Sequence, residues 1–395
     1  MKGIVVWSLF SIVIGFQGAS AQFPIKIPKI TTEKPKVEQP KAETTPRPAD
    51  SGQSPSTTSG PSGGDYVEPT APDKPMFMKE TLDVSAKTEA RYWKVPNQNS
   101  NPSWFPMVEF KVFYSGGSKQ RFNAEWFNAD GTPWFTEQLE YGDPSGRGEA
   151  IIKSPYSNEE LNKRATQAIG TYSFKIVNTK TSETVFQGKY KVKKIAYDPK
   201  IGTNGIFYVD HEWTMPIGYA GATADDWNTK EVHPAVMMWL KGEFENRDME
   251  SRLFYNGQEV ASSDDGGSIS TIQTRGGDCY LYRPTCEYKL WRFTWNKLWV
   301  LSQGYMRTKY PGGIYTIDKP GEYTAKIFYK GTQIREAKFS FDKNGGITLT
   351  PYSANLFPTI SLIPVKVMGT AEKYTSATWA ADQFYGNPLP GFIMP

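Results

Sequence analysis

Two stretches of the sequence, GTYSFKI at residues 170–176 and GEYTAKI at residues 321–327, share one pattern. Each has a glycine, a tyrosine two positions later, and then alternating apolar and polar residues. Alternation with a period of two places successive side chains on opposite faces of an extended chain, so each stretch predicts a β-strand with one buried face. Because the pattern occurs twice, it also predicts an internal repeat.

The segments around these two stretches follow one another in the same order. The first unit has strand-like runs at residues 108–114, 122–127, 134–135 and 188–192, and the second has them at residues 235–240, 252–255, 258–261 and 337–341. Asn256-Gly257 predicts a two-residue hairpin, because both central residues of a type I′ turn need positive φ. The composition, with 35 Gly and 29 Pro, suits short strands and turns better than long helices.

Tyr172 and Tyr323 occupy the same place in the two units. In immunoglobulin-like sandwiches, a tyrosine near the start of strand F hydrogen-bonds back to the backbone a few residues upstream. On these residues the sequence resembles tandem immunoglobulin-like or fibronectin-like β-sandwich domains of secreted bacterial envelope proteins. The resemblance implies an all-β fold of two tandem antiparallel sandwiches with minor short helices, and a role in binding or spacing. The cysteine and tryptophan spacing of antibody domains is absent, so that subgroup is not implied.

The N-terminus has the pattern of a secretory signal peptide. Lys2 precedes an apolar run at residues 4–16, and Ala19-Ser20-Ala21 forms an A-x-A cleavage site. The apolar run is too short to span a bilayer as a helix. We therefore expect an exported protein, located in the periplasm, at the cell surface or outside the cell, with no transmembrane span after cleavage.

A proline-rich segment follows the predicted signal peptide. Between residues 22 and 75, 11 of 54 residues are Pro, and only Phe23 and Tyr66 are aromatic. Such a segment cannot bury enough apolar surface to offset the loss of chain entropy, so it predicts a disordered linker. The expected organisation is a signal peptide (1–21), a linker (22–75), a first β-sandwich (76–197), a second β-sandwich with a disulfide and aromatic insertion (198–346) and a C-terminal extension (347–395).

Four segments between and after the repeated runs have weaker patterns. We expect residues 205–209 to form the first strand of the second sandwich and residues 359–367 to form a strand that pairs back on a sandwich. Residues 157–167 begin with a capping-box pattern and predict a short helix. Residues 370–385, which Gly386 and Pro388 follow, predict another.

The residues that usually carry chemistry are scarce. The chain has 2 His, 2 Cys and a net charge of +4, which disfavours a histidine-based triad, a multi-ligand metal site and a broad nucleic-acid surface. His211, in Asp210-His211-Glu212-Trp213, is either an acid–base or metal residue or a histidine at the surface or between domains. We expect no enzyme activity, no catalytic residue, no cofactor, no metal and no nucleic-acid partner.

Cys279 and Cys286 enclose a six-residue loop, and in an exported protein two cysteines this close predict a disulfide. Between the equivalent turn and the Gly-x-Tyr stretch, the second unit has 63 residues (258 to 321) where the first has 38 (132 to 170). We therefore predict that the long connection at residues 279–315 is a recognition element. Its candidate binding residues are Tyr280, Tyr282, Arg283, Trp291, Trp295 and Trp299.

The three tryptophans form a row whether residues 288–299 are a strand or a helix. The row is either part of a hydrophobic core, part of a protein interface, or a platform for sugar rings. We expect a non-catalytic binding or assembly component, an adhesion or scaffold protein, whose partner is another envelope protein. The alternative is a carbohydrate-binding protein or accessory module whose partner is an extracellular glycan. The sequence leaves the oligomeric state open.

Overall fold

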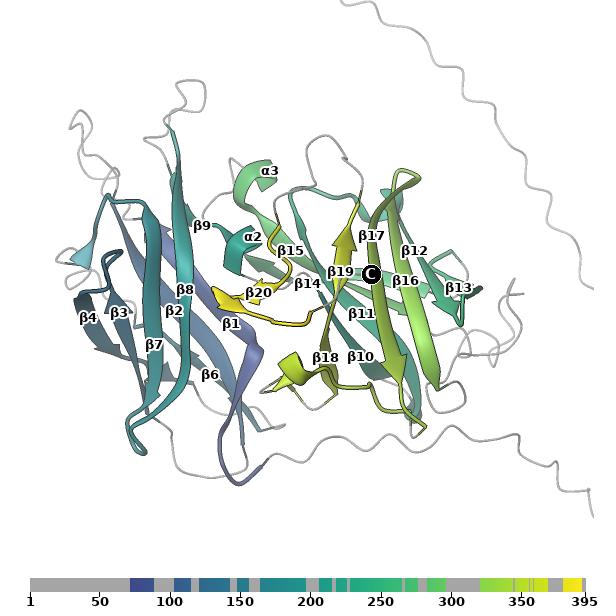
Figure 1. Cartoon of the computed structure of the whole chain (residues 1–395), viewed down its shortest axis with the longest axis horizontal. Helices are drawn as coiled ribbons and strands as arrows, with labels where there is room; N and C mark the ends of the chain where they lie inside the picture. Colours follow the sequence, from purple (N-terminus) through teal and green to yellow (C-terminus); the bar gives the residue numbers. More distant parts are fainter. Residues whose placement is uncertain are drawn as a thin grey trace, which may run out of the picture. The chain divides into compact units, whose positions relative to one another are not determined.

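The protein is an all-β chain in the computed structural model, with several antiparallel sheets and almost no helix (Figure 1). The structure describes residues 72–88, 103–114, 121–142, 148–155, 164–196, 206–214, 218–225, 228–264, 267–275, 283–295, 320–343, 345–354, 356–357, 359–368 and 379–392. The helical elements among them are one-turn segments, α2 (His211–Thr214), α3 (Arg283–Cys286), η2 (Asn246–Asp248) and η4 (Pro351–Ser353). The all-β prediction is confirmed.

The first strand set, β1 to β9, forms two sheets. One has the order β1-β2-β6-β5, from β1 (Met76–Thr88), β2 (Trp104–Phe113), β5 (Glu140–Tyr141) and β6 (Glu149–Lys153). The other has the order β4-β3-β7-β8-β9, from β3 (Phe122–Phe127), β4 (Pro133–Gln138), β7 (Gly170–Asn178), β8 (Glu183–Ile195) and β9 (Ile206–Val209).

The second strand set, β10 to β19, also forms two sheets. One has the order β14-β15-β11-β10-β18, from β10 (Gly218–Asp225), β11 (Asn228–Lys241), β14 (Gly267–Arg275), β15 (Tyr288–Trp295) and β18 (Ile360–Ile363). The other has the order β13-β12-β16-β17-β19, from β12 (Met249–Tyr255), β13 (Gln258–Ser262), β16 (Gly321–Tyr329), β17 (Thr332–Phe341) and β19 (Val365–Val367). A separate pair, β20 (Gln383–Phe384) and β21 (Asn387–Pro388), follows.

The two strand sets repeat the same order. The sheet β4-β3-β7-β8-β9 corresponds strand for strand to β13-β12-β16-β17-β19, and β1-β2-β6-β5 corresponds to β10-β11-β15-β14, to which the second set adds β18. The repeated sequence runs therefore form equivalent strands. Asn256 and Gly257 have φ of 47° and 82°, which fits the two-residue turn expected between β12 and β13.

Two predictions about the order of segments were wrong. Residues 206–209 form β9, which pairs with β8 in the first strand set, so they are not the first strand of the second unit. Residues 288–295 were predicted to belong to the long connection that is special to the second unit. They form β15, which pairs with β11 as β6 pairs with β2, so the first unit has an equivalent strand. The first prediction failed because the sequence of residues 206–209 does not record which unit the strand joins. The second failed because the 63-residue connection contains a strand that the first unit also has.

The two weaker segment predictions near the C-terminus had different outcomes. Residues 359–367 do pair back: β18 joins β10 and β19 joins β17, one strand in each sheet of the second set. The helix predicted over 370–385 was wrong in its described part, where residues 379–385 form turns and β20. Most of the helix predicted at 157–167, the signal peptide and the linker up to residue 71 lie outside the described residues.

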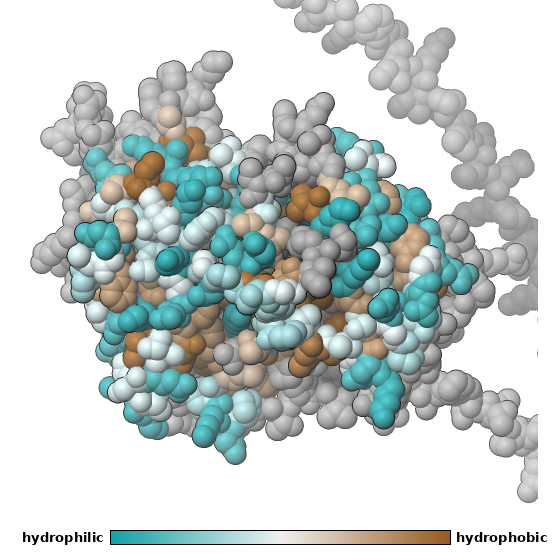
Figure 2. Space-filling view, in the orientation of Figure 1, coloured by the Kyte–Doolittle hydropathy of each residue, from teal (hydrophilic) through white to brown (hydrophobic). Residues whose placement is uncertain are grey.

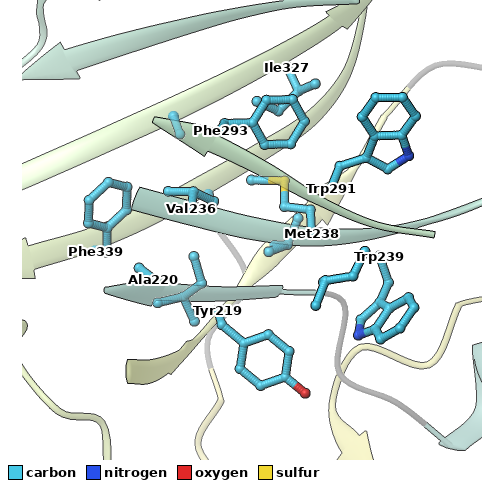
Figure 3. Close-up of a cluster of buried hydrophobic side chains, with 14 of the residues drawn as sticks. Tyr219, Ala220, Val236, Met238, Trp239, Trp291, Phe293, Ile327 and Phe339 are labelled. Carbon is cyan, nitrogen blue, oxygen red and sulfur yellow. The ribbon is translucent and has the colours of Figure 1, made fainter. Parts of the chain in front are cut away.

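Each strand set encloses a hydrophobic core between its sheets. The first core includes Trp104, Phe110, Trp126, Phe174 and Tyr190, and the second includes Met238, Phe293, Ile327, Tyr323 and Phe339. Figure 3 shows Val236 and Phe293 on one side of the strands and Tyr219 on the other. The core face of each strand holds every second residue, as the alternation predicts.

The sheet that contains β11 and β15 is buried on both faces. Tyr219, Trp239 and Leu290 lie on the face opposite Val236 and Phe293, as their cross-strand register shows, and each is no more than 6% exposed. An antiparallel sheet usually has one face in water. The opposite face here is covered by three elements: β1, α2 and the segment at residues 379–392, described below.

The outer surface in view mixes hydrophilic and hydrophobic residues without a single large apolar area (Figure 2). Within the described ranges, no helix is long and apolar enough to cross a membrane.

Candidate functional site

The C-terminal hairpin, which we define as residues 379–392 with β20 and β21, contacts both hydrophobic cores. Phe384 and Tyr385 belong to the first core, whereas Trp379, Ala381 and Leu389 belong to the second. The hairpin therefore joins the two strand sets through side chains that are almost completely buried. Its surroundings therefore bring together residues of both strand sets.

Tyr385, at the tip of the hairpin, has no exposed surface. Its hydroxyl donates to the carbonyl of Leu82 at 3.1 Å and accepts from the backbone N–H of Val84 at 3.2 Å. Its own carbonyl accepts from the N–H of Lys189 at 2.7 Å. One residue of the hairpin thus holds a strand from each sheet of the first set, β1 and β8.

The local sequences of β1 and β8 make room for this tyrosine. The β1–β2 register shifts between Met78 and Asp83, so the intervening residues bulge away from the regular ladder. In β8, a side chain at Gly188 would place its Cβ 2.9 Å from the Cβ of Tyr385 and 3.1 Å from the carbonyl oxygen of Tyr385. Gly188 is therefore the residue that lets the hairpin approach.

Arg275, the last residue of β14, points into the same region and its side chain is 2% exposed. Its Nη2 donates to the carbonyl of Leu82 at 2.6 Å, and its Nε lies 3.4 Å from Oδ1 of Asp83. The guanidinium also lies 4.7 Å from the ring centre of Trp239. Burial raises the pKa of Asp83, and the charge of Arg275 opposes that rise. Removing either partner of such a buried pair leaves an uncompensated charge.

The Asp210-His211-Glu212 motif lies beside this ion pair and is also buried. Nε2 of His211 lies 3.8 Å from Asp83, and its ring packs edge-on against Tyr288 at 5.2 Å. Burial, with the nearby charge of Arg275, lowers the pKa of His211 well below its usual value. His211 is therefore neutral at neutral pH and belongs to the contact between the strand sets.

The two carboxylates of the motif are engaged by lysines. Asp210 lies 2.6 Å from Nζ of Lys193 in the first strand set, and Glu212 lies 2.5 Å from Nζ of Lys241 in the second. The carbonyl of Glu212 accepts from the N–H of Ala380 in the C-terminal hairpin at 3.0 Å. The arrangement tethers α2 to three separate parts of the chain. Across the described ranges, no group of three or more His, Cys, Asp or Glu residues could hold a metal ion.

The structure places two of the six predicted binding residues in the second core. Trp291 is 3% exposed and Trp295 is 0% exposed (Figure 3 shows Trp291). Arg283 begins α3, and Cys286 ends it with 1% of its surface exposed. Tyr280, Tyr282, Trp299 and Cys279 lie outside the described residues, so the disulfide and the loop it would close remain predictions.

The residues that define this site were not found from the sequence. Asp83 and Arg275 lie 192 positions apart, and no local pattern links them. The sequence Phe384-Tyr385-Gly386-Asn387 does contain a turn signal, because glycine and asparagine favour positive φ. The same signal is typical of the end of a helix, which is the prediction made above, but in the structure it forms the tip of a hairpin.

No family model matches this chain, and no curated protein matches it.

Proposed function

We propose that the chain is an exported, non-catalytic binding or assembly component of the cell envelope, an adhesion or scaffold protein. The observation that carries the proposal is the burial of Asp210, His211 and Glu212, each no more than 5% exposed and each facing a partner from another element. This was the sequence motif considered for acid–base or metal chemistry. Its side chains contact both strand sets and the carbonyl of Glu212 contacts the C-terminal hairpin, which supports a structural role for the motif.

A tandem immunoglobulin-like architecture is part of the proposal, and two observations support it. The hydroxyl of Tyr172 donates to the carbonyl of Ala168, four residues upstream, at 3.0 Å, which is the geometry of a tyrosine corner. The repeated sheet orders also pair β3 with β7 and β12 with β16, as strands C and F pair in such sandwiches. Rigid sandwiches of this kind present loops, edges and outer faces to partners.

The outer face of the sheet β13-β12-β16-β17-β19 suits a binding role better than a catalytic one. Arg252 lies 2.5 Å from Glu250 and 3.8 Å from Glu259, and its guanidinium covers the ring of Phe328 at 4.9 Å. Exposed charged groups of this kind give specificity by charge complementarity with a partner.

The carbohydrate-binding alternative needs an exposed aromatic row. Because Trp291 and Trp295 lie in the core, they cannot stack on a sugar in this conformation. This observation favours the assembly role over the glycan platform.

The two roles are separated by one comparison on the purified mature chain. Binding is measured on a glycan array and, in parallel, by chemical cross-linking to intact envelopes followed by identification of the cross-linked proteins. The assembly role predicts cross-links to discrete proteins. It also predicts that a Cys279→Ser/Cys286→Ser variant gives the same glycan-array signal as the wild-type chain. Saturable binding to one glycan class, lost in that variant, would replace the proposal with the alternative.

A further inference from the structure

The C-terminal hairpin has the properties of a docked peptide rather than of an independent element. Its two strands have two residues each, and an isolated two-stranded hairpin is at best marginally stable in water. Tyr385 has φ of 47°, a left-handed conformation that is strained for a bulky residue and persists where surrounding contacts impose it. The hairpin therefore takes its shape from the surface that holds it.

That surface, the hairpin seat, is formed by β1 and β8 together with Arg275. The hairpin fills it with two aromatic side chains: Phe384 packs against Phe186 at 5.7 Å, and Tyr385 packs against Phe174 at 5.8 Å. Nζ of Lys79 lies over the ring of Phe384 at 5.0 Å. Backbone and side-chain hydrogen bonds to Leu82, Val84 and Lys189 then fix the register.

Gly188 controls access to the seat. It lies inside β8, opposite Phe174, and has no positive φ, so the strand itself can accept a side chain there. The space above it is occupied by Tyr385 and by the ring of Phe186. A β-branched side chain at this position would exclude the hairpin while leaving the hairpin's own sequence intact.

We propose that the hairpin seat also accepts the C-terminal hairpin of a second copy, so that copies of this chain join by exchanging hairpins. The described contacts that hold the hairpin in its seat are hydrogen bonds and ring contacts, which can re-form with a second copy. Exchange replaces each contact with an identical one from the other copy, which makes it a low-cost route to assembly. The inference rests on the assembly role proposed above and names the partner.

The test mixes two full-length variants with complementary defects. Tyr385→Ala keeps a seat with the native Gly188 but weakens the hairpin, whereas Gly188→Val keeps the native hairpin but blocks the seat. Each variant alone is expected to be a monomer by light scattering. Their equimolar mixture is expected to form a heterodimer, because the hairpin of the second variant can enter only the seat of the first. The control mixture contains Tyr385→Ala and Thr184→Val, a variant at an exposed position of the same strand. It should give no more heterodimer than a mixture of Tyr385→Ala and the wild-type chain.

A second measurement does not depend on how the core variants fold. Nδ2 of Asn387 lies 3.0 Å from the carbonyl of Gln187, and both residues are at the exposed rim of the seat. One copy carrying Gln187→Cys and another carrying Asn387→Cys should form a covalent heterodimer under mild oxidation, whereas Thr184→Cys with Asn387→Cys should not. A mixture that stays monomeric in both measurements would overturn hairpin exchange, while leaving an assembly role with a different partner intact.

Discussion

Tyr172 and Tyr190 stack 5.7 Å apart in the first core, yet their hydroxyls have opposite surroundings. The Tyr172 hydroxyl donates to Ala168, whereas that of Tyr190 is buried with no hydrogen-bond partner. Tyr172→Phe should therefore lower the free energy of unfolding by about 1 kcal/mol, and Tyr190→Phe should leave it unchanged or raise it. Urea unfolding of the two variants measures the difference. An equal loss in both would show that the Tyr172 hydrogen bond does not stabilise the corner.

Glu80, within the bulge of β1, is a second residue with a measurable signature. Its Oε1 accepts from the N–H of Phe357 at 3.2 Å, whereas its Oε2 is buried with no hydrogen-bond partner. Burial raises the pKa of Glu80 from 4.5 to about 7, against the lowering effect of the Phe357 N–H. The charges nearest to it come from Glu149, which adds to the rise, and Lys111, which opposes it.

The sign of the resulting pH dependence follows from proton binding. Between about pH 4.5 and 7 the folded chain keeps a proton on Glu80 that the unfolded chain has lost, so this residue's contribution to stability falls as pH rises. Glu80→Gln should match wild type near pH 4 and exceed it by about 2–3 kcal/mol at pH 8. His211 has the opposite effect, because it destabilises the fold as pH falls. That effect is the same in wild type and Glu80→Gln, so it cancels when the free energies of unfolding of the two proteins are subtracted at each pH. Glu109→Gln, an exposed site on β2, is the control and should not change the slope.

At the scale of elements, one ion pair joins β1 to β14. Arg275→Met should cost about 3 kcal/mol or more, since it leaves Asp83 buried and removes the hydrogen bond to Leu82. Asp83→Asn should also destabilise, and the double variant should cost less than the sum. Arg252→Met, whose side chain is 40% exposed, should cost under about 1 kcal/mol. Strict additivity at Asp83 and Arg275 in denaturant unfolding would show that the two residues do not interact.

The elements also show how far local sequence determines this fold. Alternation and turn residues predicted most of the strands and the Asn256-Gly257 hairpin, because both depend on neighbouring residues. Pairing over long distances was not predictable in the same way. The sequence of β9 would suit a strand of either set. Its pairing with β8 is what places it in the first. Arg275, Gly188 and Tyr385 become a site only when three distant segments meet, which no local pattern records.

The whole molecule differs from two independent domains joined by a linker, because Tyr385 and Phe384 complete the first core from the far end of the chain. The two strand sets should therefore unfold in one calorimetric transition, with equal calorimetric and van't Hoff enthalpies.

Tyr385→Ala tests this coupling directly. It removes the aromatic ring from the first core and the two hydrogen bonds of the hydroxyl to the backbone of β1, while the carbonyl of residue 385 can still accept from Lys189. The first strand set should therefore melt earlier, and a second transition should separate from it. Phe392→Ala removes a ring that packs only near the second core, against Tyr352 at 5.3 Å, and should lower the midpoint slightly without splitting the transition. Two transitions in the wild-type protein, with the first unaffected by Tyr385→Ala, would mean that the hairpin contributes nothing to the stability of the first strand set and that the two sets fold separately.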